Sequence, residues 1–210
     1  MANSRIQLML VDDHYVVRMG LRAVLDLQPD MAIVAEGEDG AEAVKLFAQH
    51  KPDVALMDLR MPGFSGIEAV ERIRKDFPSA RILMLTTFDG DEDIYRAMEA
   101  GAYGYLLKNA PRSELLAAIR QVYNGKQYLP ADIARSLAER RASEHLTERE
   151  VEALELASKG CSNKEIASVL AITEHTAKAH MKHILEKLGV EDRTGAVTLA
   201  LRRGIIHLEE

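Results

Sequence analysis

The sequence predicts an α/β unit built on a five-stranded parallel, doubly wound sheet, followed by an all-α unit. Between residues 6 and 125, short apolar runs alternate strictly with amphipathic stretches of helical period, which indicates right-handed βαβ units with helices on both sheet faces. From residue 146 onward the apolar residues recur only at helical spacing. We therefore expect domains at residues 1–125 and 146–210 of the 210-residue chain, joined by a linker at residues 126–145.

The strands expected in the first unit are short and mostly apolar, and they lie at residues 6–12, 31–37, 54–58, 81–87 and 103–107. The helices expected between and after them lie at residues 15–27, 40–49, 65–76, 91–100 and 111–123. Ser65 and Glu68 have the spacing of a capping box, which predicts where the third helix begins. Asn124 and Gly125 are residue types that end helices, so the fifth helix should stop there.

The linker and the second unit follow from similar signals. Pro130 interrupts the chain, and the charges of both signs at residues 132–141 predict a short helix with solvated faces. The helices expected beyond it lie at residues 148–158, 163–170, 174–188 and 193–203. The first two begin at capping boxes, formed by Thr147 with Glu150 and by Ser162 with Glu165. Only three residues separate the second helix from the third, which is the spacing of a helix-turn-helix.

The composition excludes several classes of protein. No run reaches the roughly 18 apolar residues of a membrane span, and the N-terminus lacks a signal-peptide pattern, so we expect a cytoplasmic protein without membrane contact. The single cysteine, Cys161, excludes an internal disulfide and a cysteine metal cluster. The net charge is -6, and residues 145–210 hold 9 Lys and Arg against 11 Asp and Glu. A role in DNA binding must therefore rest on the local placement of basic residues.

Polar residues stand at the carboxyl ends of the expected strands, where open parallel sheets bind ligands. Asp58 ends the apolar run VALM, and Asp12 and Asp13 end the first strand. Thr86 ends the fourth strand, and Lys108 follows the fifth. Three carboxylates that meet in one crevice repel one another unless a divalent cation or shared protons neutralise them.

This set of groups fits the transfer of a phosphoryl group. Asp58 would be the nucleophile that accepts it. Lys108 would neutralise one phosphoryl oxygen, and the hydroxyl of Thr86 would donate to another. The groups that would hold Mg²⁺, directly or through its waters, are the carboxylates of Asp12, Asp13 and Asp58 and the main-chain carbonyl of Arg60.

Residues 1–125 resemble the receiver domain of two-component response regulators, which has a flavodoxin-like fold. The motifs that carry the resemblance are LVDD, LMDLRMPGFSG, LMLTTF and GAYGYLLK. It implies that a sensor histidine kinase phosphorylates Asp58, and that the receiver catalyses only its own Mg²⁺-dependent phosphorylation and dephosphorylation. It also implies that Tyr105 is a switch aromatic, which turns inward once Thr86 has moved toward the phosphoryl group. Asn109 stands where many receivers have proline.

The helix expected at residues 174–188 has two distinct faces when it is wound at 3.6 residues per turn. One face is apolar and should pack on the other helices, and it holds Ala177, Met181, Ile184, Leu185 and Leu188. The opposite face holds His175, Lys178, Ala179, Lys182 and Glu186. Two lysines one turn apart, beside a small alanine, would let this helix enter a major groove and reach bases or phosphates.

Residues 146–206 resemble the four-helix DNA-binding domain of the NarL/FixJ (LuxR-type) regulators, through LTEREVEALELASKG, SNKEIASVLAITEHTAKAHMKHILEKLGV and DRTGAV. The resemblance implies base reading by Lys178, Ala179 and Lys182. It implies contacts to the DNA backbone from Ser162, Asn163, Lys164, Thr173, Thr176 and His180. The last helix carries an apolar stripe longer than a brace needs, and the resemblance implies dimerisation through Ala196, Val197, Leu199, Ala200 and Leu201.

We therefore expect a DNA-binding response regulator, in which phosphorylation of Asp58 shifts dimerisation or interdomain contacts and so controls transcription. The expected partners are a sensor histidine kinase, double-stranded promoter DNA, a second copy of the chain and RNA polymerase. One alternative is a Mg²⁺-dependent phosphatase acting through an aspartyl phosphate at Asp58, although Arg60 stands where its general acid would be and no insertion could form a cap. Another is an interaction module with vestigial C-terminal helices, which a gel-shift assay with promoter DNA would distinguish.

Overall fold

The structure is a computed structural model, and it describes residues 5–87, 91–130, 134–135 and 145–207. The chain divides into two compact units near residue 134. Within the described ranges, every helix is too short or too polar to span a bilayer. The short helix expected at residues 132–141 falls on a segment of which only Ala134 and Arg135 are described.

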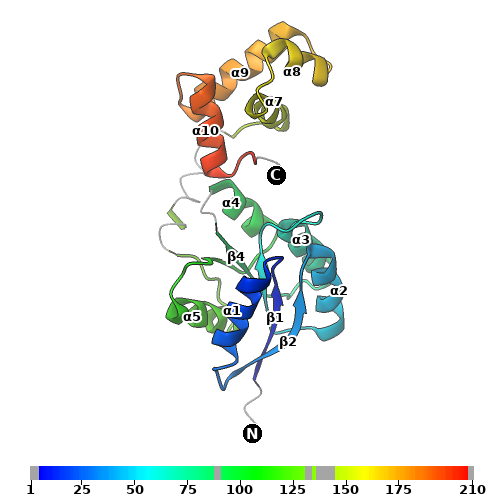
Figure 1. Cartoon of the computed structure of the whole chain (residues 1–210), viewed down its shortest axis with the longest axis vertical. Helices are drawn as coiled ribbons and strands as arrows, with labels where there is room; N and C mark the ends of the chain where they lie inside the picture. The colour runs from blue at the N-terminus through cyan, green and yellow to red at the C-terminus, as the bar shows by residue number, and fades with distance from the viewer. Residues whose placement is uncertain (1–4, 88–90, 131–133, 136–144, 208–210) are drawn as a thin grey trace. The chain divides into compact units, whose positions relative to one another are not determined.

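The first unit is built on one parallel sheet (Figure 1). Its strands are β1 (Ile6–Val11), β2 (Met31–Gly37), β3 (Val54–Asp58), β4 (Ile82–Thr86) and β5 (Gly104–Leu107). Their order across the sheet is β2-β1-β3-β4-β5. The predicted fold class is confirmed, and each predicted strand boundary lies within one residue of the observed one. Because the order reverses beside β1, the crevice at the carboxyl ends of β1 and β3 is the expected binding position of this topology.

Helices cover both faces of the sheet. They are α1 (Tyr15–Leu25), α2 (Gly40–His50), α3 (Gly66–Asp76), α4 (Asp91–Glu99) and α5 (Arg112–Tyr123). Figure 1 shows α1 and α5 on one side of the sheet and α2 and α3 on the other. On the first side, leucines from α1 and α5 pack with alternate residues of the strands, such as Leu8, Leu10 and Leu106. Strands β3 and β4 are buried on both faces, which explains why they read as nearly continuous apolar runs.

The chain beyond α5 returns to the free edge of the sheet. The backbone N–H of Tyr128 donates to the carbonyl of Tyr103, and its carbonyl accepts from the N–H of Tyr105, at 3.1 and 3.0 Å. This bridge covers part of the edge of β5, which would otherwise expose unpaired backbone groups. The phenol of Tyr128 donates to Glu114 Oε1 at 2.8 Å, and burial together with this contact raises the pKa of Tyr128 to about 12.

The second unit consists of α7 (Glu148–Ser158), α8 (Asn163–Val169), α9 (Glu174–Leu188) and α10 (Arg193–Arg203). The capping boxes predicted at Thr147 and Ser162 are both present, as is the one at Ser65 in the first unit. Helices α8 and α9 are joined by a tight turn in which Ala171 has a left-handed backbone, with φ 54°. One apolar core joins all four helices, from Ala153 and Leu154 on α7 to Ala200 on α10.

Candidate functional site

The sheet brings the predicted phosphate-handling residues to one edge. Asp12 directly follows β1, Asp58 is the last residue of β3, and Thr86 is the last residue of β4. Lys108 follows β5, and its backbone N–H donates to the carbonyl of Thr86 at 2.7 Å. Neighbouring strands in register therefore deliver these residues to the same end of the sheet, as their positions in the sequence predicted.

Lys108 lies between two buried carboxylates. Its Nζ is 2.6 Å from Asp12 Oδ2 and 2.7 Å from Asp58 Oδ2. Burial alone would lower the pKa of Lys108, but hydrogen bonds to Asp12 and Asp58 outweigh it, so the pKa lies above its usual value. Burial raises the pKa of Asp58, Lys108 acts against this shift, and the negative charge of Asp12 adds to it. The single positive charge of Lys108 thus does not neutralise the two negative charges of Asp12 and Asp58.

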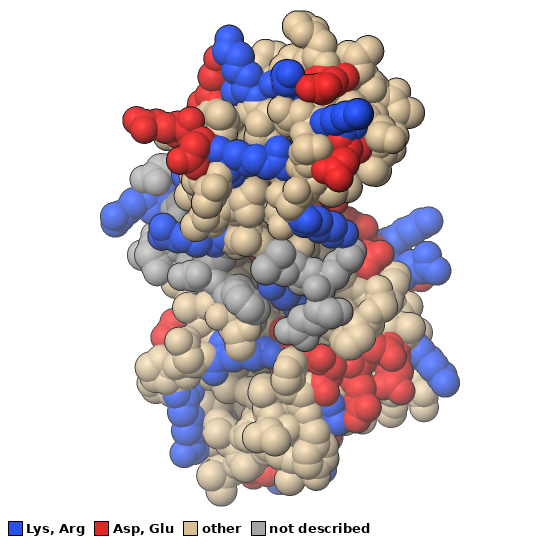
Figure 2. All heavy atoms as spheres, turned by 45° about the horizontal axis from the view of Figure 1, so that its top comes forward, with Lys and Arg blue, Asp and Glu red and all other residues tan. Residues whose placement is uncertain are grey.

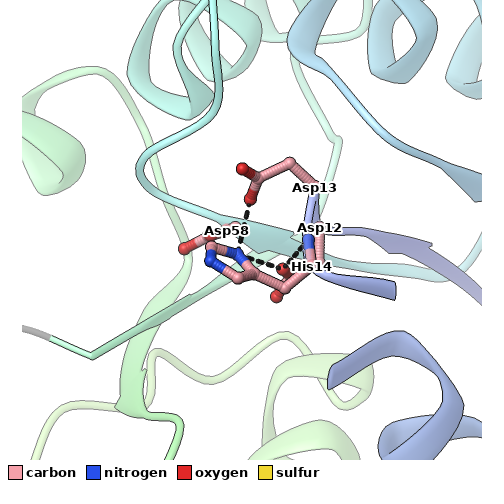
Figure 3. A group of neighbouring side chains, drawn as sticks. All are labelled: Asp12, Asp13, His14 and Asp58. Atoms are coloured by element: carbon pink, nitrogen blue, oxygen red, sulfur yellow. Dashed lines mark hydrogen bonds and ion pairs between the residues drawn. The ribbon is translucent and has the colours of Figure 1, made fainter. Parts of the chain in front are cut away.

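Asp13 and His14 complete the acidic cluster (Figure 3). His14 Nδ1 lies 2.8 Å from Asp13 Oδ1 and 3.4 Å from Asp12 Oδ1. The backbone N–H of His14 donates to Asp12 Oδ1 at 2.9 Å. One ligand atom from each of Asp12, Asp13, His14 and Asp58 lies within 4.8 Å of all the others. His14 was not among the predicted site residues, although its place directly after two strand-end carboxylates was a visible signal.

The donor atoms at this edge fit a hard divalent cation. Carboxylate oxygens from Asp12, Asp13 and Asp58 are the ligands that Mg²⁺ prefers, and the ion normally keeps several waters. Asp13 is half-buried, so such waters would have access from one side. Arg60 is half-buried in the loop after β3, and its backbone N–H donates to the Asp58 carboxylate. A bound cation would also add the positive charge that is still needed beside Lys108 to neutralise the carboxylates.

The loop that follows Asp58 depends on glycine. The N–H of Gly66 donates to the carbonyl of Leu59 at 3.1 Å, and a Cβ at position 66 would lie 2.0 Å from the carbonyl oxygen of Asp58. Such a contact is impossible without moving the backbone of Asp58 itself. Gly66 also begins α3, directly after the capping residue Ser65. The start of α3 and the place of Asp58 are therefore set by the same backbone contact.

The side chains of Thr86 and Tyr105 are buried on the sheet. The side chain of Tyr105 is completely buried, and Thr86 is only 1% exposed. Because Leu106 packs on the α1 and α5 side, Tyr105 faces the opposite side of the sheet. Tyr105 is therefore in the inward position, which the resemblance to receiver domains implies for the switched state.

In the second unit, α9 has the two faces predicted from the sequence. Ala177, Met181, Ile184 and Leu188 are buried, while Leu185 is half-buried against the same core. Lys178 and Lys182 are exposed and belong to ion pairs with glutamates one turn away on α9. Lys178 Nζ lies 2.9 Å from Glu174 Oε1, and Lys182 Nζ lies 3.5 Å from Glu186 Oε1. Exposed pairs of this kind add little stability, so either lysine can be released from its glutamate at little cost.

Most of the other residues predicted to contact DNA lie at the starts of α8 and α9, and His180 lies further along α9. Ser162 caps α8 and Thr173 caps α9, and Thr176 Oγ1 lies 2.8 Å from Thr173 Oγ1. Lys164 is exposed, whereas Asn163, Ala179 and His180 are half-buried. Two helix N-termini with hydroxyl caps on one domain provide donors suited to phosphate oxygens.

Charge is not concentrated around these residues. On the face drawn in Figure 2, Lys and Arg side chains are interspersed with Asp and Glu side chains. In the part of the chain that the structure describes, the candidate metal cluster is the one around Asp12, and His175, His180 and His183 form none. Along α9 the two lysines stand beside Glu174 and Glu186, so the basic positions are local, as the charge count indicated.

The apolar stripe of α10 is used mainly inside its own domain. Ala196 and Ala200 are buried in the core, and Val197, Leu199 and Leu201 are half-buried and pack against it. All five residues contact the core of their own domain, and dimerisation through α10 stays a prediction. The exposed parts of Val197, Leu199 and Leu201 are the apolar surface of this stripe that a partner could contact.

Comparison with known proteins decides the family. Residues 8–120 match the family described as response regulator receiver domain, and residues 144–200 match the family described as bacterial regulatory proteins, luxR family. The chain belongs to the two-component response regulators. It joins the receiver domain to a LuxR-type helix-turn-helix domain, so it is a DNA-binding regulator of transcription.

Relatives of this response regulator match it over nearly its whole length. The response regulator protein VraR of Staphylococcus saprophyticus is 42% identical over 206 residues, which cover 96% of this chain and 99% of that protein. The response regulator ChrA of a heme-sensing two-component system is 40% identical, with a TM-score of 0.58 over 97% of this chain and 100% of its own. A structure of two RcsB dimers bound to two parallel DNAs is 26% identical, with a TM-score of 0.70 over 95% of this chain and 99% of its own.

Proposed function

We propose that this response regulator is switched by phosphorylation of Asp58 by a sensor histidine kinase in the cytoplasm. The observation that carries the proposal is the meeting of Asp12, Asp58 and Lys108 at one end of the sheet, with both carboxylates within 2.7 Å of the lysine. Phosphorylation then favours a homodimer that binds promoter DNA and controls access of RNA polymerase. The dimer rests on the relatives, since RcsB is seen as dimers on DNA.

The chemistry follows from the positions of the side chains. A carboxylate oxygen of Asp58 forms a bond to phosphorus while the bond from phosphorus to the kinase imidazole breaks, and the imidazole leaves. Lys108 is held beside Asp58, where its ammonium neutralises charge on the transferred oxygens. Thr86, at the end of the neighbouring strand, supplies a hydroxyl donor. Bound Mg²⁺ would neutralise phosphoryl oxygens and would be held by the Asp12, Asp13 and Asp58 carboxylates and the Arg60 carbonyl.

The response must travel from Asp58 to the DNA-binding unit. Thr86 and Tyr105 stand on the adjacent strands β4 and β5. Tyr105 pairs with Met84 and Thr86 pairs with Leu107, so the two residues are two positions apart in register. The Tyr105 ring is already buried, so a shift of Thr86 toward the phosphoryl group would give the ring more room in that buried position, and the surface around β4 and β5 would change with it. Coupling of this kind is worth about 1–3 kcal/mol.

Intact-mass analysis tests the proposal. Wild-type chain treated with acetyl phosphate and Mg²⁺ is expected to gain one phosphoryl mass, and chain treated with a chelator in place of Mg²⁺ is expected to gain none. The chelator effect follows because the carboxylates then repel the incoming phosphoryl oxygens. Absence of the adduct in the presence of Mg²⁺ would contradict the proposal. Turnover of small phosphate esters would favour the phosphatase alternative.

Kinase docking can be tested separately on α1. Its exposed residues beside the acidic cluster are apolar, since Tyr15 is 65% exposed, Val16 80% and Met19 48%. We expect Val16→Glu to slow phosphotransfer from the cognate kinase about tenfold, which corresponds to about 1.4 kcal/mol. Labelling by acetyl phosphate should be unchanged. Val169→Glu, at an exposed valine on α8, is the matched control. An equal loss with both phosphodonors would place the defect in the acceptor site.

The reading of bases by α9 gives a further prediction. Lys178→Ala and Lys182→Ala are each expected to weaken binding to a duplex selected from random DNA by the wild-type protein, by about 1–3 kcal/mol, with little change on a scrambled duplex. Fluorescence anisotropy at fixed salt concentration measures both. Lys159→Ala removes the same charge at the end of α7 and should leave both affinities near wild type. An equal loss on the two duplexes would assign the lysine to phosphate contact.

A further inference from the structure

Arg18 is a buried charged residue that the proposed chemistry does not use. It lies on α1 and is 7% exposed, and within the described ranges it is the arginine that is buried. Leu21 and Leu25, three and seven residues later on the same helix, pack in the apolar core between α1, α5 and the sheet. Helical spacing thus puts Arg18 where an apolar side chain would be expected. A guanidinium there loses hydration and needs partners to compensate.

The partners of Arg18 lie in two different loops. Nη1 donates to the main-chain carbonyl of Asp12 at 2.5 Å, and Nη2 donates to Glu38 Oε1 at 2.5 Å. The ring of Tyr15 lies 5.9 Å from the guanidinium carbon, in the range of a cation–π contact. Glu38 is largely exposed, at 68% for its side chain, so its carboxylate remains partly solvated. The contact that is fully buried is the one to Asp12.

This contact fixes the backbone on which the acidic cluster is built. The N–H of Asp12 donates to the carbonyl of Gly37 at 3.2 Å, and the carbonyl of Asp12 accepts from Arg18. Both peptide groups that flank Asp12 are therefore held, one by β2 and one by α1. The second of them leads directly to Asp13, so its orientation also sets where the Asp13 carboxylate points. A fixed backbone here aligns two of the three carboxylates in the proposed Mg²⁺ site.

We infer that Arg18 is a positioning residue for the metal-binding carboxylates, acting through the main-chain carbonyl of Asp12. The inference rests on the proposed function, because it concerns the affinity of the same acidic site for Mg²⁺. Groups that orient metal ligands without touching the metal commonly change metal affinity by about 10–100-fold when they are removed. Arg18 has that relation to Asp12 and Asp13, because it binds the main-chain carbonyl between them.

The test compares Arg18→Met with Arg22→Met. Arg22 is one turn further along α1 and pairs with Glu36 on β2, but it is exposed and contacts none of the acidic cluster. Titration calorimetry with MgCl₂ on the full chain should give at least a tenfold weaker Kd for Arg18→Met and an unchanged Kd for Arg22→Met. The Mg²⁺ concentration for half-maximal phosphorylation by acetyl phosphate should rise by a similar factor, while the rate at saturating Mg²⁺ changes less.

Two further variants test whether Arg18 acts through the main-chain carbonyl of Asp12. Arg18→Lys keeps the charge but has one donor group, which cannot serve both loops, and it carries the test if Arg18→Met does not fold. Its Kd for Mg²⁺ is expected to be several-fold weaker than that of wild type. Glu38→Gln removes only the partly solvated partner and should bind Mg²⁺ like wild type. A loss in Glu38→Gln as large as that in Arg18→Met would overturn the assignment to the Asp12 carbonyl.

The results of these titrations distinguish failure of the inference about Arg18 from failure of the proposed function. A folded Arg18→Met chain, or a folded Arg18→Lys chain in its place, that binds Mg²⁺ within twofold of wild type would overturn the inference alone. A wild-type chain that binds no Mg²⁺ would overturn the proposed function, and the inference with it. Thermal melting without metal identifies which variants are folded at the assay temperature.

Discussion

Asp58→Asn is expected to abolish phosphorylation by both acetyl phosphate and the cognate kinase while leaving the chain folded. The amide nitrogen of asparagine is not a nucleophile, and its oxygen carries no full charge, so no covalent adduct can form. The fold should survive because the amide has the shape of the carboxylate and Lys108 keeps its ion pair with Asp12. Intact-mass analysis measures the first effect and thermal melting the second.

The electrostatics of the site sharpen this expectation. Burial and the nearby Asp12 both disfavour a charge on Asp58, so removing that charge relieves unfavourable interactions even though a contact to Lys108 is weakened. We therefore expect a melting temperature at or above that of wild type. DNA binding by the variant should be insensitive to acetyl phosphate. Asp26→Asn, at the exposed end of α1, is the control and should be labelled normally. An adduct on Asp58→Asn at the wild-type level would place the acceptor elsewhere.

Much of the fold could be predicted because local and tertiary signals agree. Val54 to Asp58 reads as a strand that is buried on both faces and ends at an acid, and the structure has that strand with those bounds. Capping boxes at Ser65, Thr147 and Ser162 fixed helix starts because the two partners of each box lie three residues apart. Strand ends could also be grouped into a site, because parallel strands in one sheet end on the same side.

The features that could not be predicted depend on contacts between distant residues. Arg18 looked like any charge on an amphipathic helix, since its partner Glu38 lies 20 residues away in another loop. The alternation of apolar residues on α10 could be read in the sequence, but the share of that stripe used by its own core could not. Glu150 was recognised as the second half of a capping box, and nothing local indicated its pairing with Lys187. Periodicity assigns a residue to a face and leaves its partner undetermined.

Lys187→Met is expected to destabilise the DNA-binding unit by about 3 kcal/mol, because it leaves a buried carboxylate without its counter-charge. Glu150 is 3% exposed, and Lys187 Nζ lies 2.7 Å from its Oε2 and 3.0 Å from the carbonyl of His145. The pair ties the end of α9 to the start of α7. Urea unfolding followed by far-ultraviolet circular dichroism measures the loss. All six tyrosines lie in the first unit, so tyrosine fluorescence follows that unit separately.

The pH dependence distinguishes loss of this charge pair from loss of packing. Burial by itself raises the pKa of Glu150, but hydrogen bonds from Lys187 and Thr147 outweigh it, and the pKa lies below the usual 4.5. A carboxyl whose pKa is lower in the folded state contributes stability above its unfolded pKa, and that contribution disappears as the pH falls through the folded value. The difference in stability between wild type and Lys187→Met should therefore be full at neutral pH and shrink below about pH 4.5. Arg149→Met breaks the exposed Arg149–Glu152 pair on α7 and should cost under about 1 kcal/mol at any pH. A loss in Lys187→Met that persisted unchanged in acid would mean that the methylene packing of Lys187, and not its charge, holds α7 to α9.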